Sequence, residues 1–188
     1  MANRPKDKGT YAESAVVEFL QENGWPYAER RSLKGSLDKG DVTGCPGLVW
    51  EVKYAGSGIR MGGWIEETCT ETVNAKADHG ILVIKPSRLG TKRTGQWIAV
   101  MAAPDAQALL QKAPSDFSIA VSPHDTYNAN RLQSDLTGMR KTEELSMVVR
   151  RPPGTLEKPE DWYYITLLST ITDILRVAGY GTELARAT

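Results

Sequence analysis

Asp41, Glu51 and Lys53 combine residue types and a spacing that could perform chemistry. Glu51 and Lys53 are separated by one residue within the run 48–54. Side chains alternate across a β-strand, so a strand over this run places both on one face. An otherwise apolar central strand that carries a carboxylate and an amine must pair them, solvate them or use them to bind a metal ion.

Asp41 lies at the start of an expected strand over 41–43, and the turn at 44–47 would join that strand to 48–54 as a hairpin. A connecting loop with an odd number of residues, such as 44–48, places Asp41 opposite Glu51 on the same face. An even loop places it opposite Trp50 instead. Whether the loop has an odd or an even number of residues therefore determines whether the two carboxylates share a face.

Two carboxylates a few ångströms apart repel each other, and a divalent cation is the usual means of holding them together in the ionised form. Mg²⁺ suits oxygen ligands and retains water, which can become the nucleophile against a phosphodiester, and we expect Mn²⁺ to substitute for it. Lys53 could orient or deprotonate that water, or neutralise charge in the transition state. The residues therefore predict phosphodiester hydrolysis.

The elements that must position these residues follow an α/β pattern. Helices are expected over 10–23, 64–77, 104–110 and 168–178, and strands over 25–30, 41–43, 48–54, 80–84, 96–102 and 162–166. The short apolar run 80–84 directly follows a helix, which favours a central strand covered on both faces. We therefore expect a mixed central β-sheet flanked by helices.

The length of 188 residues and the hydrophobic content of 40% predict an ordinary buried core. We divide the chain into a core over 1–112, an insertion of unknown role over 113–160, and a C-terminal strand and helix over 161–188 that pack on the core. Within the insertion, strands are expected at 117–121 and 145–149.

The formal net charge is zero, which argues against a uniformly basic surface that binds nucleic acid. Any such binding must come from local basic patches, which the sequence places in three loops: Arg30, Arg31, Lys34 and Lys39; Lys85, Arg88, Lys92 and Arg93; and Arg150 with Arg151. The two cysteines form no CxxC pair, and no apolar stretch has the length of a signal core or a spanning helix. These features predict a cytoplasmic protein that does not contact a membrane.

The charged residues also match a known signature. Glu13 on the first helix, Asp41 in the run 39–42, and Glu51-Val52-Lys53 resemble the E…D…ExK signature of PD-(D/E)XK nucleases. Together with the run 30–36, they are similar to archaeal-type Holliday junction resolvases. The segments 162–164 and 175–181 resemble versions from actinobacterial phages.

The resemblance implies a restriction-endonuclease-like αβββαβ core with a C-terminal extension, and a Mg²⁺-dependent endodeoxyribonuclease. Asp41, Glu51 and the backbone carbonyl of Val52 would hold the metal, Glu13 would complete the site, and Lys53 would serve the attacking water. The segment 113–160 departs from the compact resolvases. The residues expected to contact DNA, with Ser32 in the loop where the resolvases carry a functional serine, are Arg30, Arg31, Ser32, Lys34, Lys39 and Arg60.

Each residue also has a structural interpretation. Glu13 stands three residues after Thr10 and could complete a capping box. Asp41 could be an ordinary turn aspartate, and Glu51 and Lys53 could form a partly exposed salt bridge on an edge strand. All four residues together, in this order, favour the nuclease.

Three functions remain open on the sequence alone. The first is a homodimeric endonuclease that cuts branched or four-way DNA, in the host cytoplasm if a phage encodes it. The second is a nuclease of the same chemistry with another substrate: restriction-like, nicking or exonucleolytic. The third is a catalytically silent nucleic-acid-binding phage protein, which the intact acidic set disfavours because a silent scaffold has no need of mutually repelling carboxylates.

Overall fold

The structure, a computed structural model, describes residues 4–32, 37–56, 59–112, 119–122, 130, 132–135, 137, 146–150 and 162–182. The elements up to residue 85 are α1 (Arg4–Glu22), β1 (Glu29–Arg30), β2 (Val42–Thr43), β3 (Leu48–Tyr54), α2 (Met61–Ala75) and β4 (His79–Lys85). The elements that follow are η1 (Thr91–Gln96), β5 (Ile98–Ala102), α3 (Ala103–Leu110), β6 (Ile119–Ser122), β7 (Ser146–Arg150), β8 (Trp162–Leu167) and α5 (Leu168–Val177).

Six strands form the main sheet, in the order β3-β4-β5-β8-β7-β6. β3 and β4 are parallel, as are β6 and β7, whereas the pairs β4–β5, β5–β8 and β8–β7 are antiparallel. The expectation of an α/β structure with a mixed sheet flanked by helices is confirmed. Two strands from the segment 113–160 extend the sheet at the edge opposite β3, and the C-terminal β8 lies inside it.

The expected hairpin between the second and third strands is wrong. β2 pairs with β1 in a separate antiparallel sheet of two strands, and β3 is an edge strand of the described main sheet rather than a central one. β2 is only two residues long and pairs with β1, whereas the seven residues of β3 pair along one edge with β4. One side of β3 is therefore available to the residues before it in the chain.

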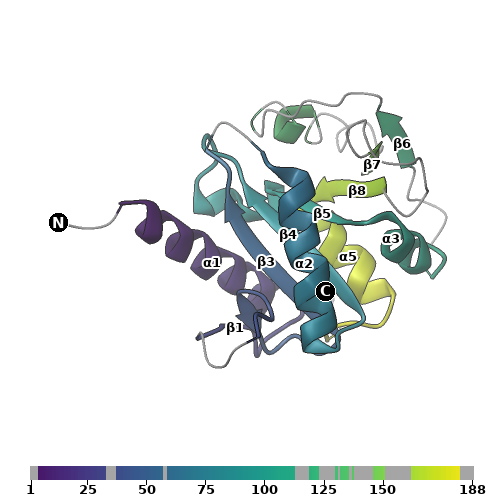
Figure 1. Cartoon of the computed structure of the whole chain (residues 1–188), viewed down its shortest axis with the longest axis horizontal. Helices are drawn as coiled ribbons and strands as arrows, with labels where there is room; N and C mark the ends of the chain where they lie inside the picture. The colour runs from purple at the N-terminus through teal and green to yellow at the C-terminus, as the bar shows by residue number, and fades with distance from the viewer. Residues whose placement is uncertain are drawn as a thin grey trace, which may run out of the picture.

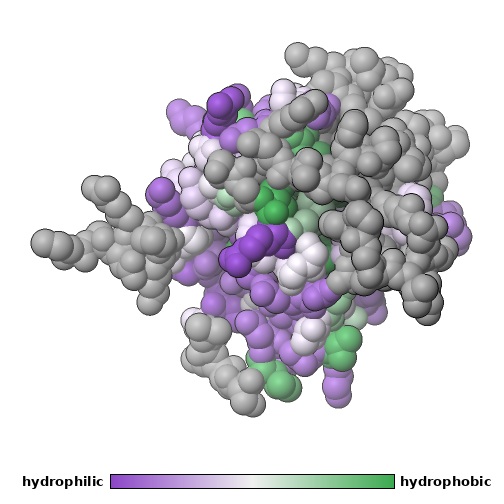
Figure 2. Space-filling model, turned by 45° about the horizontal axis from the view of Figure 1, so that its top comes forward, coloured by the Kyte–Doolittle hydropathy of each residue, from purple (hydrophilic) through white to green (hydrophobic). Residues whose placement is uncertain are grey.

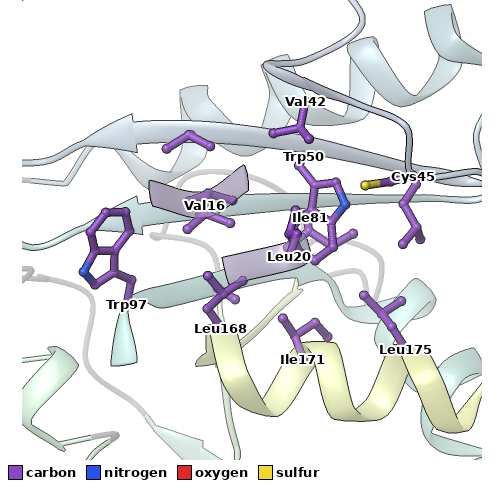
Figure 3. Packing of buried hydrophobic residues seen from close by; sticks show 14 of the residues in the cluster. Val16, Leu20, Val42, Cys45, Trp50, Ile81, Trp97, Leu168, Ile171 and Leu175 are labelled. Atoms are coloured by element: carbon purple, nitrogen blue, oxygen red, sulfur yellow. The ribbon is translucent and has the colours of Figure 1, made fainter. Parts of the chain in front are cut away.

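Helices cover both faces of the sheet (Figure 1). On one face, α1 and α5 pack with Trp50 and Ile81, and Figure 3 shows Ile171 and Leu175 of α5 pointing toward these strands. On the other face, α2 packs on β3 and β4, and Ile65 joins a second cluster. Apolar burial on each side stabilises the strands by roughly 25 cal/mol per Å² removed from water.

The buried side of α2 includes an acid. Met61, Ile65, Thr68 and Glu71 are buried, whereas Cys69, Val73 and Lys76 are exposed. Gly80 allows the close approach of α2 to β4, because a Cβ there would lie 2.2 Å from the Thr72 hydroxyl oxygen. An acidic residue of α2 thus faces the sheet.

The first helix is longer than the sequence pattern predicts. It begins at Arg4, so that Thr10 lies inside the helix and the capping box with Glu13 is not formed. Pro5 occupies the first turn, where a missing N–H costs no helical hydrogen bond. Glu13 is therefore available for another role.

On the face shown in Figure 2, the described surface is mostly hydrophilic, and hydrophobic residues form small separate spots. Large hydrophobic side chains that are exposed include Tyr27 and Val73, which belong to different elements. Among the described helices, none is both long and apolar enough to cross a membrane.

Candidate active site

Glu51 and Lys53 lie on the face of β3 that α2 covers. Their strand partners Leu82 and Ile84 on β4 belong to the cluster under α2. The Glu51 side chain is only 7% exposed, and the Lys53 Nζ lies 2.6 Å from its Oε1. As expected from strand periodicity, Trp50 points to the opposite face. The sequence therefore places the carboxylate and the amine correctly.

Asp41 approaches the free edge of β3 through two hydrogen bonds. Its backbone N–H donates to the Trp50 carbonyl at 2.9 Å, and its Oδ2 accepts from the Val52 N–H at 2.8 Å. The loop 44–47 has an even number of residues, and Asp41 is accordingly opposite Trp50, so the odd-loop register is wrong. The carboxylate still meets Glu51, because the bond from Val52 holds it at the strand edge, where it shares a hydrogen bond with Glu51.

Gly40 makes this approach possible. Its φ is +82°, and a Cβ on it would lie 2.8 Å from Val49 Cγ1 and 2.9 Å from the Trp50 carbonyl oxygen. A side chain at this position would therefore be strained in backbone conformation and would also clash with β3. The Gly40-Asp41 pair is a geometric requirement for bringing the carboxylate to the strand.

Two acids of α2 join the site, and sequence analysis missed both. The carboxylate of Glu67 lies 3.0 Å from the Lys53 Nζ and is mostly exposed. Glu71, one turn further, is only 5% exposed and shares a hydrogen bond with Glu51. Its Oε2 is buried and has no hydrogen-bond partner among the residues that the structure describes. The available signal was the i, i+4 spacing of two acids on the helix after Lys53.

Burial and mutual repulsion raise the pKa values of the buried acids. Burial, followed by the charge of Asp41, raises the pKa of Glu51 to about 9. Burial, followed by the charge of Asp38, raises the pKa of Glu71 to about 7. Burial also raises the pKa of Asp41, although the hydrogen bond from Val52 opposes it. These acids therefore bind protons far more strongly than exposed carboxyl groups do.

For Lys53, burial and the neighbouring acids shift the pKa in opposite directions. Burial would lower the pKa of its ammonium, but the hydrogen bonds and charges of Glu51 and Glu67 outweigh burial and raise it. Lys53 therefore remains charged throughout the neutral range.

Glu13 lies on α1, and its charge contributes to the raised pKa of Asp41. Its Oε2 accepts hydrogen bonds from Arg30 Nε at 3.0 Å and Nη2 at 2.6 Å. The structure thus brings Glu13 to the neighbourhood of the site, but an arginine already engages its carboxylate.

The residues expected to contact DNA have different surroundings. Ser32 and Arg60 are exposed and Lys39 is partly exposed, whereas Lys34 lies outside the described residues. Arg31 donates to the Val42 carbonyl and lines a surface pocket of about 280 Å³ near the turn 44–47. Lys8, whose Nζ lies 5.3 Å from the centre of the Tyr54 ring, is a further exposed cation near the end of β3.

The donor set suits a hard divalent cation, which prefers oxygen ligands. Besides the carboxylates of Asp41 and Glu51, the Val52 carbonyl is a candidate donor, because the N–H and C=O of one strand residue point to the same edge. The buried Glu71 Oε2 has no hydrogen-bond partner. Within the described part of the chain, no three Asp, Glu, His or Cys side chains are already arranged as a ligand set.

Comparison with known proteins gives no match: no protein-family model matches the chain, and no curated protein and no solved structure is similar to it. The function is therefore inferred from the residues and geometry of this chain.

Proposed function

We propose that this protein is a Mg²⁺-dependent DNA endonuclease of the PD-(D/E)XK type. The observation that carries the proposal is the meeting of Asp41 and Glu51 at the edge of β3, with the Lys53 ammonium 2.6 Å from Glu51. Two carboxylates that repel each other can be held together by a divalent metal that activates water, and an adjacent ammonium can assist that chemistry.

A purely structural role for the Glu51–Lys53 salt bridge does not explain why further acids are buried beside it. An ion pair between Glu51 and Lys53 leaves Asp41 and Glu71 buried beside another negative charge. Burying such charges without compensation is unfavourable, and replacing them with neutral side chains would cost the fold nothing. The surplus of carboxylates therefore favours a functional role over a structural one.

The resemblance to PD-(D/E)XK nucleases supports the same class. The order α1-β1-β2-β3-α2-β4 agrees with an αβββαβ core, although β1 and β2 form a sheet of their own. In this assignment Asp41, Glu51 and the Val52 carbonyl hold the metal, which when bound would activate a water and polarise the phosphate. Because Lys53 stays charged in the neutral range, it orients the attacking water or neutralises charge on the phosphorane, and the alternative of deprotonating the water is disfavoured.

For the substrate, we propose branched DNA cut by a homodimer, on the basis of the similarity of the run 30–36 and its flanking motifs to junction resolvases. A nuclease with the same centre and another substrate is the main alternative. The two differ in what they cut, not in the residues of the centre.

Incubation with labelled four-way junctions, flaps, duplexes and single strands, in Mg²⁺ or in EDTA, tests both levels. We expect paired symmetric nicks on the junction in Mg²⁺, none in EDTA, and rates at least about a hundredfold lower for Asp41→Asn and Glu51→Gln. The exposed Glu18→Gln is the matched control and should cleave normally. Undiminished cleavage by Asp41→Asn refutes the site, whereas equal cleavage of plain duplex refutes only the junction preference.

A further inference from the structure

We infer that Glu71 of α2, rather than Glu13 of α1, supplies the third carboxylate of the divalent-cation site. This inference rests on the proposed function and names a ligand that neither the sequence pattern nor the resemblance indicates. Three structural observations lead to it.

The first observation is the state of the Glu71 side chain. The side chain is buried, with a relative exposure of 5%, and it reaches the Glu51 carboxylate. Within the described part of the chain, its Oε2 has no hydrogen-bond partner. An orphaned carboxylate oxygen inside a protein is unfavourable unless something binds it. A cation bound by the neighbouring Glu51 carboxylate is a group that could bind this oxygen.

The second observation is the balance of charge. Asp41, Glu51, Glu67 and Glu71 surround Lys53, whose ammonium contacts Glu51 and Glu67. When all four carboxyl groups are ionised, this one positive charge leaves a surplus of negative charge, which a divalent cation would offset in place of bound protons.

The third observation is the state of Glu13. Arg30 donates from both Nε and Nη2 to its Oε2, so ligation through that oxygen requires breaking a charge-assisted contact of 2.6 Å. Glu71 has no such competitor, because its buried oxygen is unpaired. Glu71 is therefore better prepared for ligation than Glu13.

The position of α2 explains how a helix can deliver this ligand. Gly80 has no side chain, and Thr68 and Thr72 pack directly against it. Both hydroxyl groups donate to carbonyls of their own helix, which satisfies them in this close contact. The helix is thereby held near β3, where Glu71 meets Glu51.

Mn²⁺ binding, measured by isothermal titration calorimetry at pH 8, tests the inference without relying on cleavage. Glu71→Gln should weaken Mn²⁺ binding at least about tenfold, whereas Glu13→Gln should bind within about twofold of the unmodified protein. The exposed Glu66→Gln on the same helix is the matched control. Thermal unfolding with and without Mn²⁺ verifies folding, and the stabilisation by Mn²⁺ should shrink for Glu71→Gln alone among these three.

Two results overturn the inference in distinguishable ways. If Asp41→Asn abolishes Mn²⁺ binding while Glu71→Gln binds normally, Glu71 is not a ligand and the proposed centre stands. If the unmodified protein binds no Mn²⁺ and shows no stabilisation, the inference and the metal-dependent function both fail.

Discussion

The Asp41 carboxylate accepts a hydrogen bond of 2.8 Å from the backbone N–H of Val52, across the free edge of β3. This bond fixes the carboxylate between the two residues of the ExK motif that flank Val52 in the chain. It also explains why Asp41→Asn should fold normally, since an amide oxygen can accept the same bond. The acid is thus held by backbone geometry and not by a neighbouring cation.

Gly40→Ala should displace Asp41 from this position. The left-handed φ and the contacts of a Cβ with Val49 and Trp50 should destabilise the fold by about 1–3 kcal/mol and reduce cleavage. Gly62→Ala on α2, where a Cβ meets nothing within 4 Å, should leave stability unchanged or raise it by up to about 1 kcal/mol. Urea denaturation compares the two. Equal stability of the two variants contradicts the role given to Gly40.

Lys53→Met separates chemistry from metal binding. The ammonium sits against Glu51, so its removal should not weaken Mn²⁺ binding, but it should lower the cleavage rate by about 10²–10⁴-fold through loss of the group that serves the water or the phosphorane. Single-turnover cleavage and calorimetry provide the two readouts, with the exposed Lys92→Met as control. Normal cleavage by Lys53→Met would mean that the Glu51–Lys53 contact is a structural salt bridge with no part in the chemistry.

The raised pKa of Glu71 predicts how stability depends on pH in EDTA. Between its ordinary value of 4.5 and about 7, folded Glu71 retains a proton that the unfolded chain has lost. Folding stability should therefore fall as pH rises through this window. Glu71→Gln should lack this component and be more stable than the unmodified protein at pH 8, by roughly 1–3 kcal/mol. Urea denaturation at pH 5, 6, 7 and 8 measures this, and parallel curves for both proteins would contradict it.

The same acids predict that cation binding strengthens with pH. The pKa of Glu51 is about 9, so a bound divalent cation must displace protons from the site at neutral pH. Mn²⁺ affinity should increase between pH 6 and pH 9, and calorimetry in buffers of different ionisation enthalpy should detect proton release. Affinity that does not change over this range would mean that the cation binds elsewhere.

Strong local patterns made much of the fold predictable. The apolar run 80–84 and the amphipathic segment 168–178 correspond to β4 and α5 within a residue or two. The shared face of Glu51 and Lys53 also followed from the strand period alone. These features depend on residues near each other in the chain, for which periodicity is sufficient.

Features that depend on contacts between distant elements could not be predicted in this way. The role of Glu71 was missed because the sequence pattern indicated a helix over 64–77 but did not show that an acid lies on its buried side, which depends on the packing of α2 on Gly80. β3 is an edge strand because β2 pairs with β1 instead of with β3. Local propensity does not determine this pairing.

The most direct test of the central claim is anomalous diffraction from crystals of the protein grown or soaked with Mn²⁺. We expect an anomalous peak at coordinating distance, about 2.0–2.2 Å, from carboxylate oxygens of both Asp41 and Glu51. A peak bound by other residues, or none between β3 and α2 in crystals that show Mn²⁺ elsewhere, would contradict it.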